Sequence, residues 1–278
     1  MTRPDVFTAE PATPPVGFSV REFARTARGS HRDHLELPAY ESAPLDRDTL
    51  ELVAMLARLE RGALRYLRSV LVTPTHKDAR VTGFLVTWAF EKFWVADALE
   101  RVVGAHLSFT PPRTGTPRLR AARRALAERV EPIRESVVAN LIGDDVVAVH
   151  CAAGAIDEWI TQAAVTRLAA GAGHPVLTRT IGRLLEVRSR HDTFFTQEAA
   201  ERLATSPTAA RLARRRLRRA TWPLGSAEEP PGLVRRLLGG LLAPSDLVAL
   251  DARVRALPGL AGLDLVTRAV RRAERSAR

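Results

Sequence analysis

The sequence predicts an all-helical protein, with a helical bundle followed by a C-terminal helical appendage. Of its 278 residues 46% are hydrophobic, which is enough to build a sizeable core. Aromatic residues make up only 5%, and the strong helix formers Ala, Leu and Arg are abundant. Long segments place apolar residues three and four positions apart, which is the helical period, whereas strand-like alternation is scarce.

Composition divides the chain into three parts. Residues 1–47 carry several prolines and no sustained periodicity apart from a possible short helix at 20–26, so we expect an extended leader. Residues 48–205 contain the long periodic segments and form the expected bundle. Residues 206–278 begin with a densely basic stretch and continue as short helices, which predicts a C-terminal helical appendage.

Four long helices are expected in the bundle. Asp48 and Thr49 offer an N-cap for the first helix. A breaker-rich loop and a basic stretch at 119–140 separate the second helix from the third, so the pattern is two helical pairs joined by a crossover. The second helix is apolar almost all round, which is typical of a helix buried inside a bundle. The four expected ranges are about 50–71, 80–105, 145–170 and 178–204.

The charge and the cysteine content limit the class of protein. The net charge is +11, which predicts an arginine-rich surface or, as the alternative, an acidic partner. The single cysteine, Cys151, excludes a disulfide framework and argues against cysteine-ligated zinc. The N-terminus lacks the apolar core of a signal peptide and no run is long enough to span a bilayer, so we expect a cytoplasmic protein with no membrane span.

Each expected helix carries one charged residue in the middle of its apolar stripe. These residues are Glu60, Lys92, Glu158 and Arg188, and His191 follows Arg188 by one turn. A single charge in such a stripe could be a snorkelling side chain at its edge. Four buried charges are costly unless they are paired, and two acids with two bases can neutralise one another. The pattern therefore predicts that these side chains meet in the interior.

Four segments carry a family resemblance: RSVLVTPTHKDARVTGFLVTWAFEKFWVADAL, VVAVHCAAGAIDEWITQAAVTRLAAGAGHPVL, RLLEVRSRHDTFF and RRLRRATWPLGS. They resemble the ferritin-like dimetal-carboxylate superfamily, in particular actinobacterial ferritin-like proteins related to the acyl-carrier-protein desaturases. The resemblance implies a ferritin-like four-helix bundle. In that family one Glu from each of two helices and a Glu-x-x-His pair from each of the other two hold the metals. Carried over, Glu60 and Glu158 match the lone glutamates and His191 matches one histidine, so these three would be the ligands of any bound metal.

Three positions depart from the family pattern. Lys92 and Arg188 stand where two glutamates are expected, and Val95 stands where the second histidine is expected. Four carboxylates can lie together in such a site because two cations neutralise them, whereas fixed positive charges make the cations unnecessary and repel them. A shifted register could enlist Glu91 or Glu186, but neither has a histidine three residues later. We therefore expect a degenerate metal site and no cofactor, with iron as the alternative.

Three functions stay open at this point. The first is an enzyme of specialised metabolism that acts without metal on a small or acyl substrate, free or bound to a carrier protein. Glu60, Lys92, Glu158, Arg188 and His191 would then supply acid–base and oxyanion-stabilising groups. The second is a non-catalytic binding or structural relative in which these residues form a buried ion-pair network. The third is a di-iron oxidase or desaturase with unusual ligands. A cavity beside the charges would favour the first, and complete pairing without a void would favour the second.

The other candidate histidines and the cysteine are interpreted as structural residues without a catalytic role. His150, Cys151 and Asp157 lie on one expected helix, but adjacent helical residues point about 100° apart, so no Cys–His dyad is expected. His31 and His34 are expected at the surface.

The basic segment 211–219 has no stacking aromatic residue nearby except Trp222, so nucleic acid is not an expected partner. A homodimer remains an open possibility.

Overall fold

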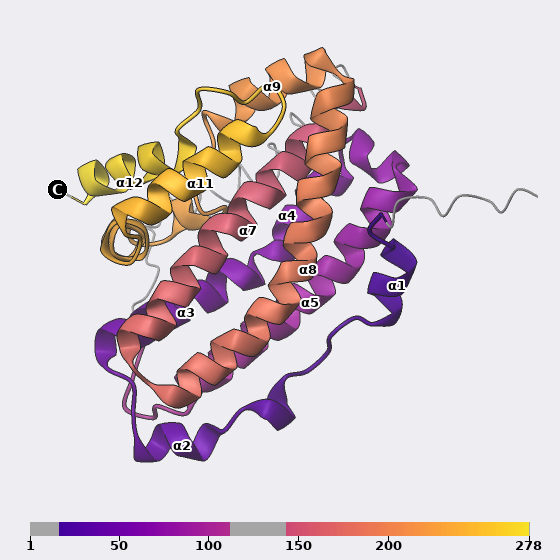
Figure 1. Ribbon diagram of the computed structural model, residues 1–278. Helices are drawn as coiled ribbons and strands as arrows, with labels where there is room; N and C mark the ends of the chain where they lie inside the picture. The colour runs from indigo at the N-terminus through magenta and orange to yellow at the C-terminus, as the bar shows by residue number, and fades with distance from the viewer. Residues whose placement is uncertain (1–16, 112–142, 278) are drawn as a thin grey trace, which may run out of the picture.

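The computed structural model describes residues 17–111 and 143–277, and over these residues the chain is helical, with no β-strand (Figure 1). The breaker-rich loop from residue 112 on and the basic stretch 119–140, which the sequence sets between the second and third helices, lie outside the described residues. No helix in the described part is long and apolar enough to cross a membrane.

Four helices, which we term the central helices, run side by side through the molecule (Figure 1). Helix α3 packs against α5, and α7 packs against α8. The bounds of α5, α7 and α8 agree with the sequence prediction to within about three residues. The central helices are α3 (Arg47–Arg61), α5 (Ala79–Gly104), α7 (Asp145–Ala172) and α8 (Pro175–Thr205).

The prediction of one continuous first helix is wrong, because the helix breaks at Gly62. Helix α3 ends at Arg61, and a separate helix, α4 (Ala63–Leu71), follows directly. Glycine is the weakest helix former after proline, so a break falls naturally at this residue. After the break Leu64 is 43% exposed, although it is an apolar residue of the expected first helix.

The starts of the central helices are capped by local side chains. Asp46, and not the expected Asp48, caps α3, and one of its carboxylate oxygens accepts the backbone N–H of Thr49 at 2.9 Å. Asp78 caps α5 in the same way through the N–H of Val81. These caps satisfy N–H groups that the helix itself cannot pair.

The described part of the N-terminal segment is partly helical. It contains α1 (Val20–Arg25), a short 3-10 turn and α2 (Leu37–Ser42), and α1 packs against α5. Phe23 and Tyr40 anchor the segment in the common core. His31, which we expected at the surface, is only 8% exposed, whereas His34 is exposed as expected.

The C-terminal helices gather on the side of α7 (Figure 1). Helix α9 packs on α7 and α8, α10 contacts α3, and α11 contacts α7. Their apolar faces join the same hydrophobic core as the central helices. They are α9 (Pro207–Leu217), α10 (Pro231–Arg235) with a π-helical continuation (Arg236–Gly240), α11 (Pro244–Ala256) and α12 (Leu265–Ser276).

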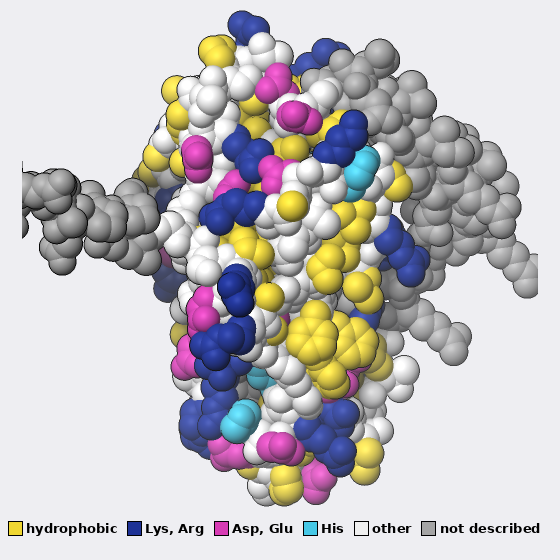
Figure 2. Space-filling model, turned by 90° about the vertical axis from the view of Figure 1, so that its right-hand side faces the viewer, with side chains coloured by type: hydrophobic (Ala, Val, Ile, Leu, Met, Phe, Trp, Pro, Cys, Tyr) yellow, Lys and Arg dark blue, Asp and Glu magenta, His cyan; other side chains and the backbone are white. Residues whose placement is uncertain are grey.

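Large apolar side chains also reach the surface on α5. Val86, Phe90 and Phe93 are each more than one third exposed, and the guanidinium of Arg61 lies 4.4 Å from the centre of the Phe93 ring. The face in Figure 2 shows hydrophobic side chains gathered between basic ones. A buried helix that is apolar all round thus keeps one exposed edge.

Candidate functional site: a buried ring of ion pairs beside a cavity

The four charged residues predicted from the helical stripes meet in the interior. Glu60 lies near the end of α3, Lys92 in the middle of α5, Glu158 in the middle of α7 and Arg188 in α8. Between 1% and 5% of each residue is exposed. Each lies at helical spacing from apolar core residues, and this spacing is what turns the charged side chain inward. The prediction that they converge is confirmed.

The contacts among them form a closed ring, which we call the ion-pair ring. The Lys92 Nζ lies 2.9 Å from Oε2 of Glu60 and 2.9 Å from Oε1 of Glu158. Arg188 donates through Nη1 to Oε1 of Glu60, and its Nη2 lies 2.9 Å from Oε2 of Glu158. Each base therefore contacts both acids, and the two negative and two positive charges cancel.

Electrostatics keep the ring ionised. Burial by itself would raise the pKa of Glu158, but Arg188, Lys92 and His191 together hold that pKa well below the ordinary glutamate value. Burial would likewise lower the pKa of Arg188, yet Glu158 and Glu60 raise it above its usual value. Glu158 and Arg188 are therefore full charges that stabilise each other away from water.

A second buried carboxylate lies next to the ring. Glu91 is completely buried on α5, and one of its oxygens accepts a hydrogen bond from Nε2 of His191 at 2.7 Å. Its other oxygen accepts the backbone N–H of Arg28 at 2.6 Å and a hydrogen bond from the Arg190 guanidinium. The Nδ1 of His191 lies 3.5 Å from Glu158, so His191 connects Glu91 to the ring.

The sequence analysis considered Glu91 only as an alternative register. The signal that could have found it is the all-round apolar character of α5, which predicts that both Glu91 and its neighbour Lys92 are buried.

The residues present do not fit a dimetal centre. The ammonium of Lys92 and the guanidinium of Arg188 lie between Glu60 and Glu158, and each contacts both carboxylates. Over residues 17–111 and 143–277, no group of three or more His, Cys, Asp and Glu side chains is arranged to hold a metal ion. A fixed cation already satisfies each carboxylate.

A cavity of about 880 Å³ reaches the ring from one side. Helix α4, helices α5 and α7, and the loop around Leu224 line it. Lys92 and Glu158 belong both to the ring and to the cavity lining, whereas Glu60, Arg188 and His191 do not line it. The apolar part of the lining is formed by Leu59, Leu64, Val72, Trp88 and Leu224.

Asp157 also lines this cavity, directly before Glu158 in the sequence. Burial raises the pKa of Asp157 to about 6; the positive charge of Lys92 opposes the rise and the negative charge of Glu158 adds to it. The backbone N–H of Leu224 donates to one oxygen of Asp157 at 2.6 Å and fixes the carboxyl group. Sequence reasoning had weighed Asp157 only in a Cys–His–Asp set.

That Cys–His–Asp set is not assembled for catalysis. Cys151 is completely buried, and burial raises the pKa of its thiol to about 12, so the thiolate is disfavoured. The Nδ1 of His150 is hydrogen-bonded to the hydroxyl of Thr75 at 2.9 Å, and burial lowers the His150 pKa to about 4. Both side chains are parts of the packing.

Comparisons with protein-family models, with curated proteins and with solved structures found no match to this chain.

Proposed function

We propose that the chain is a ferritin-like protein in which the ion-pair ring takes the place of the dimetal centre, and that the adjoining cavity is the active site of a metal-independent enzyme. Two helical pairs with one charged residue from each helix at the centre support the first part. The ring fits a pair of metal ions poorly, which agrees with the presence of Lys92 and Arg188 at positions where the dimetal-carboxylate pattern has glutamates.

The observation that carries the proposal is the overlap between the ring and the cavity. Lys92 and Glu158 line a cavity of about 880 Å³, and Asp157 stands beside them with its pKa raised to about 6. A carboxyl group with a pKa close to neutrality, placed in a cavity next to a fixed cation, is a common arrangement for acid–base chemistry.

Asp157 is the group that moves a proton in this proposal. At neutral pH most of the Asp157 carboxyl groups are ionised and act as a base, and the raised pKa makes the carboxylate a better base than an ordinary aspartate. The Leu224 N–H binds one oxygen, so the other oxygen is the one that can accept the proton of a substrate.

Lys92 provides the complementary positive charge. A lysine ammonium has three N–H donors, and the Lys92 Nζ lies 2.9 Å from one oxygen of Glu60 and from one oxygen of Glu158. Because Lys92 also lines the cavity, its ammonium can donate to a substrate oxygen there. Such a donor stabilises the negative oxygen that develops when a proton is removed next to a carbonyl group. The reaction class is therefore proton transfer at the carbon adjacent to a carbonyl.

The lining indicates the kind of substrate. Apolar side chains from α4, α5 and the loop around Leu224 fit the body of a small or acyl substrate. Arg68 also lines the cavity and favours a substrate that carries an anionic group, such as an acyl thioester on a carrier. The two other arginines of the lining, Arg61 and Arg65, are paired with Glu100 and Glu228.

The other members of the buried cluster are positioning residues in this account. Glu60 and Arg188 hold the two ring residues that face the cavity, and His191 contacts Glu158 from the far side. The initial hypothesis of a catalytic role for these three is replaced by one in which Lys92 and Asp157 meet the substrate.

One observation favours a second candidate, a binding protein without catalysis. The two acids and two bases of the ring pair with one another, which is the arrangement expected of a structural network. In that case the cavity binds a ligand and Asp157 tunes only its affinity.

Solvent exchange distinguishes the two candidates. We would incubate the protein in D₂O with acyl thioesters of N-acetylcysteamine and follow loss of the C2 proton by ¹H NMR. The parent protein is expected to catalyse exchange, and Asp157→Asn to slow it about 100-fold or more, because general-base catalysis contributes about 10²–10⁴-fold. Asp33→Asn, at an exposed position, is the matched control and leaves the rate unchanged.

Addition of a chelator should not affect the exchange rate. Thioester binding without exchange above the buffer rate would instead support the binding candidate. Equal rates for Asp157→Asn and the parent would remove Asp157 from the reaction.

A further inference from the structure

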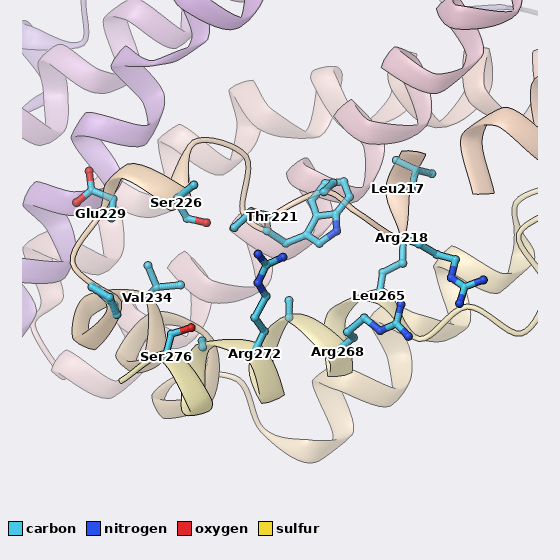
Figure 3. A pocket seen from close by; sticks show the side chains of 16 residues that line it. Leu217, Arg218, Thr221, Ser226, Glu229, Val234, Leu265, Arg268, Arg272 and Ser276 are labelled. Carbon is cyan, nitrogen blue, oxygen red and sulfur yellow. The ribbon is translucent and has the colours of Figure 1, made fainter. Parts of the chain in front are cut away.

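A second pocket lies in the C-terminal part of the chain and is lined by three arginines (Figure 3). Its volume is about 250 Å³. Arg218 follows the end of α9, while Arg268 and Arg272 lie one turn apart on α12 and so share one face of that helix. Figure 3 shows Arg272 extended toward the loop at Thr221, and Arg218 and Arg268 near each other on the right of the view.

The three arginines lack acidic partners. Within residues 17–111 and 143–277, neither Arg218, Arg268 nor Arg272 takes part in an ion pair. The acidic side chain in the lining is Glu229, and it is already bound by Arg58, whose Nη2 lies 2.6 Å from Oε2. All three arginines are exposed, so solvent balances part of their charge, and together they make the pocket attractive to an anion.

The pocket wall also contains two buried donors without a partner. The indole Nε1 of Trp222 and the hydroxyl of Ser226 have no hydrogen-bond partner in the described part of the chain, and the two residues are 3% and 2% exposed. Buried donors are normally paired, so their presence at a pocket indicates a place for an acceptor. Together with the arginines they make the lining rich in donors.

We propose that this pocket binds a phosphate monoester that carries a small apolar group. Arginine guanidinium groups match the geometry of phosphate oxygens through paired N–H donors, and a doubly charged phosphate balances three arginines better than a single carboxylate does. The apolar group would lie against Leu217, Val234, Leu265, Ala269 and Ala273, which complete the lining.

The shape of the site favours a small molecule over nucleic acid. The pocket has a volume of only about 250 Å³, and Trp222 is buried, so its ring is not available to stack on a base. This binding site is separate from the cavity at the ion-pair ring, because no residue lines both. The loop that follows Trp222 contributes different residues to each of them.

Calorimetric titration with phenyl phosphate tests the proposal. At about 0.15 M salt, which screens non-specific attraction, we expect saturable binding with one site per chain. Arg272→Ala should weaken binding about tenfold or more, because it removes a charge-assisted contact to the phosphate. The matched control is Arg271→Ala, which removes the same charge from the same helix at a likewise exposed position that does not line the pocket, and it should change the affinity by less than about twofold.

Ser226→Ala and Trp222→Phe remove one donor each and should weaken binding several-fold, with unchanged circular dichroism. Equal weakening by Arg271→Ala and Arg272→Ala would mean diffuse attraction to a basic protein, and the proposal would be abandoned. Absence of saturable binding would overturn it as well, and benzoate binding as tightly as phenyl phosphate would overturn the assignment to phosphate.

Discussion

Asp157 and Glu158 are consecutive residues of α7, yet they belong to two electrostatically different regions. Glu158 is part of the ion-pair ring, where two bases and His191 keep its pKa well below the ordinary value. Asp157 is in the cavity wall, where burial raises its pKa to about 6 and Lys92 offsets this only in part. The difference shows that buried charge serves structure where it is fully paired, and is available for chemistry where pairing is incomplete.

A substitution that breaks the ion-pair ring should lower the free energy of unfolding more than any other change considered. Glu158→Gln keeps the shape of the side chain but leaves Lys92 and Arg188 with one acid between them. Loss of one partner of a buried ion pair costs about 3–5 kcal/mol, so we expect urea denaturation to show a loss of this size in the free energy of unfolding. The control is Glu201→Gln on the exposed face of α8, which should leave stability nearly unchanged. Equal stabilities of the two variants would mean that the ring is not a mutually dependent network.

Removal of Lys92 together with Glu158 should restore part of the lost free energy of unfolding. In Lys92→Met combined with Glu158→Gln, the remaining pair of Glu60 and Arg188 is neutral and still in contact. We expect the double variant to be about 1–3 kcal/mol more stable than the sum of the two single changes, which is the range of coupling for residues in direct contact. Simple additivity in the same urea experiment would contradict the ring.

The contribution of Asp157 to stability should decrease as the pH rises, whereas that of an ordinary ion-paired aspartate increases. Because the pKa of Asp157 rises from 3.8 to about 6 on folding, its contribution to stability is complete below about pH 4 and is lost as the pH rises through 6. Asp157→Asn should therefore be about 1–3 kcal/mol more stable than the parent at pH 7.5, and the difference should vanish near pH 4. A constant difference across this range would show that Asp157 has an ordinary pKa.

Addition of metal ions should change the stability of the protein least. With cations fixed at Lys92 and Arg188, ferrous iron or manganese is expected to shift the melting temperature by less than about 1 °C, since only a ligand that binds the folded state stabilises it. The combined variant Lys92→Glu, Val95→His and Arg188→Glu is the positive counterpart and should gain metal-dependent stability. A parent protein that metal stabilises strongly would contradict the metal-free account.

Much of the fold and half of the site follow from local patterns in the sequence. The 3.6-residue period placed α5, α7 and α8 closely, and it turned Glu60, Lys92, Glu158 and Arg188 to the interior. The same period failed at Gly62, because a break in a helix depends on how the following turn packs and not on the spacing of apolar residues alone.

The cavity and the raised pKa of Asp157 could not be predicted from the periodicity of the sequence. The cavity lies where α4, which follows the break at Gly62, meets a loop from residue 224 on, and these segments are far apart in the sequence. The pKa of Asp157 depends on that same loop, through burial and the Leu224 N–H. Pairing within the ring is also tertiary: the residue types show that the charges can cancel, but only the packed helices determine that each base contacts both acids.

The most direct test of the account is a ¹³C NMR titration of the side-chain carboxyl carbons of Asp157 and Glu158 in the intact protein. We predict that Asp157 titrates with a midpoint near pH 6, and that Glu158 stays ionised as the pH falls below the ordinary glutamate value of 4.5 for as long as the protein remains folded. Two neighbours that titrate together near pH 4 would contradict the separation of ring and cavity wall on which the proposed function depends.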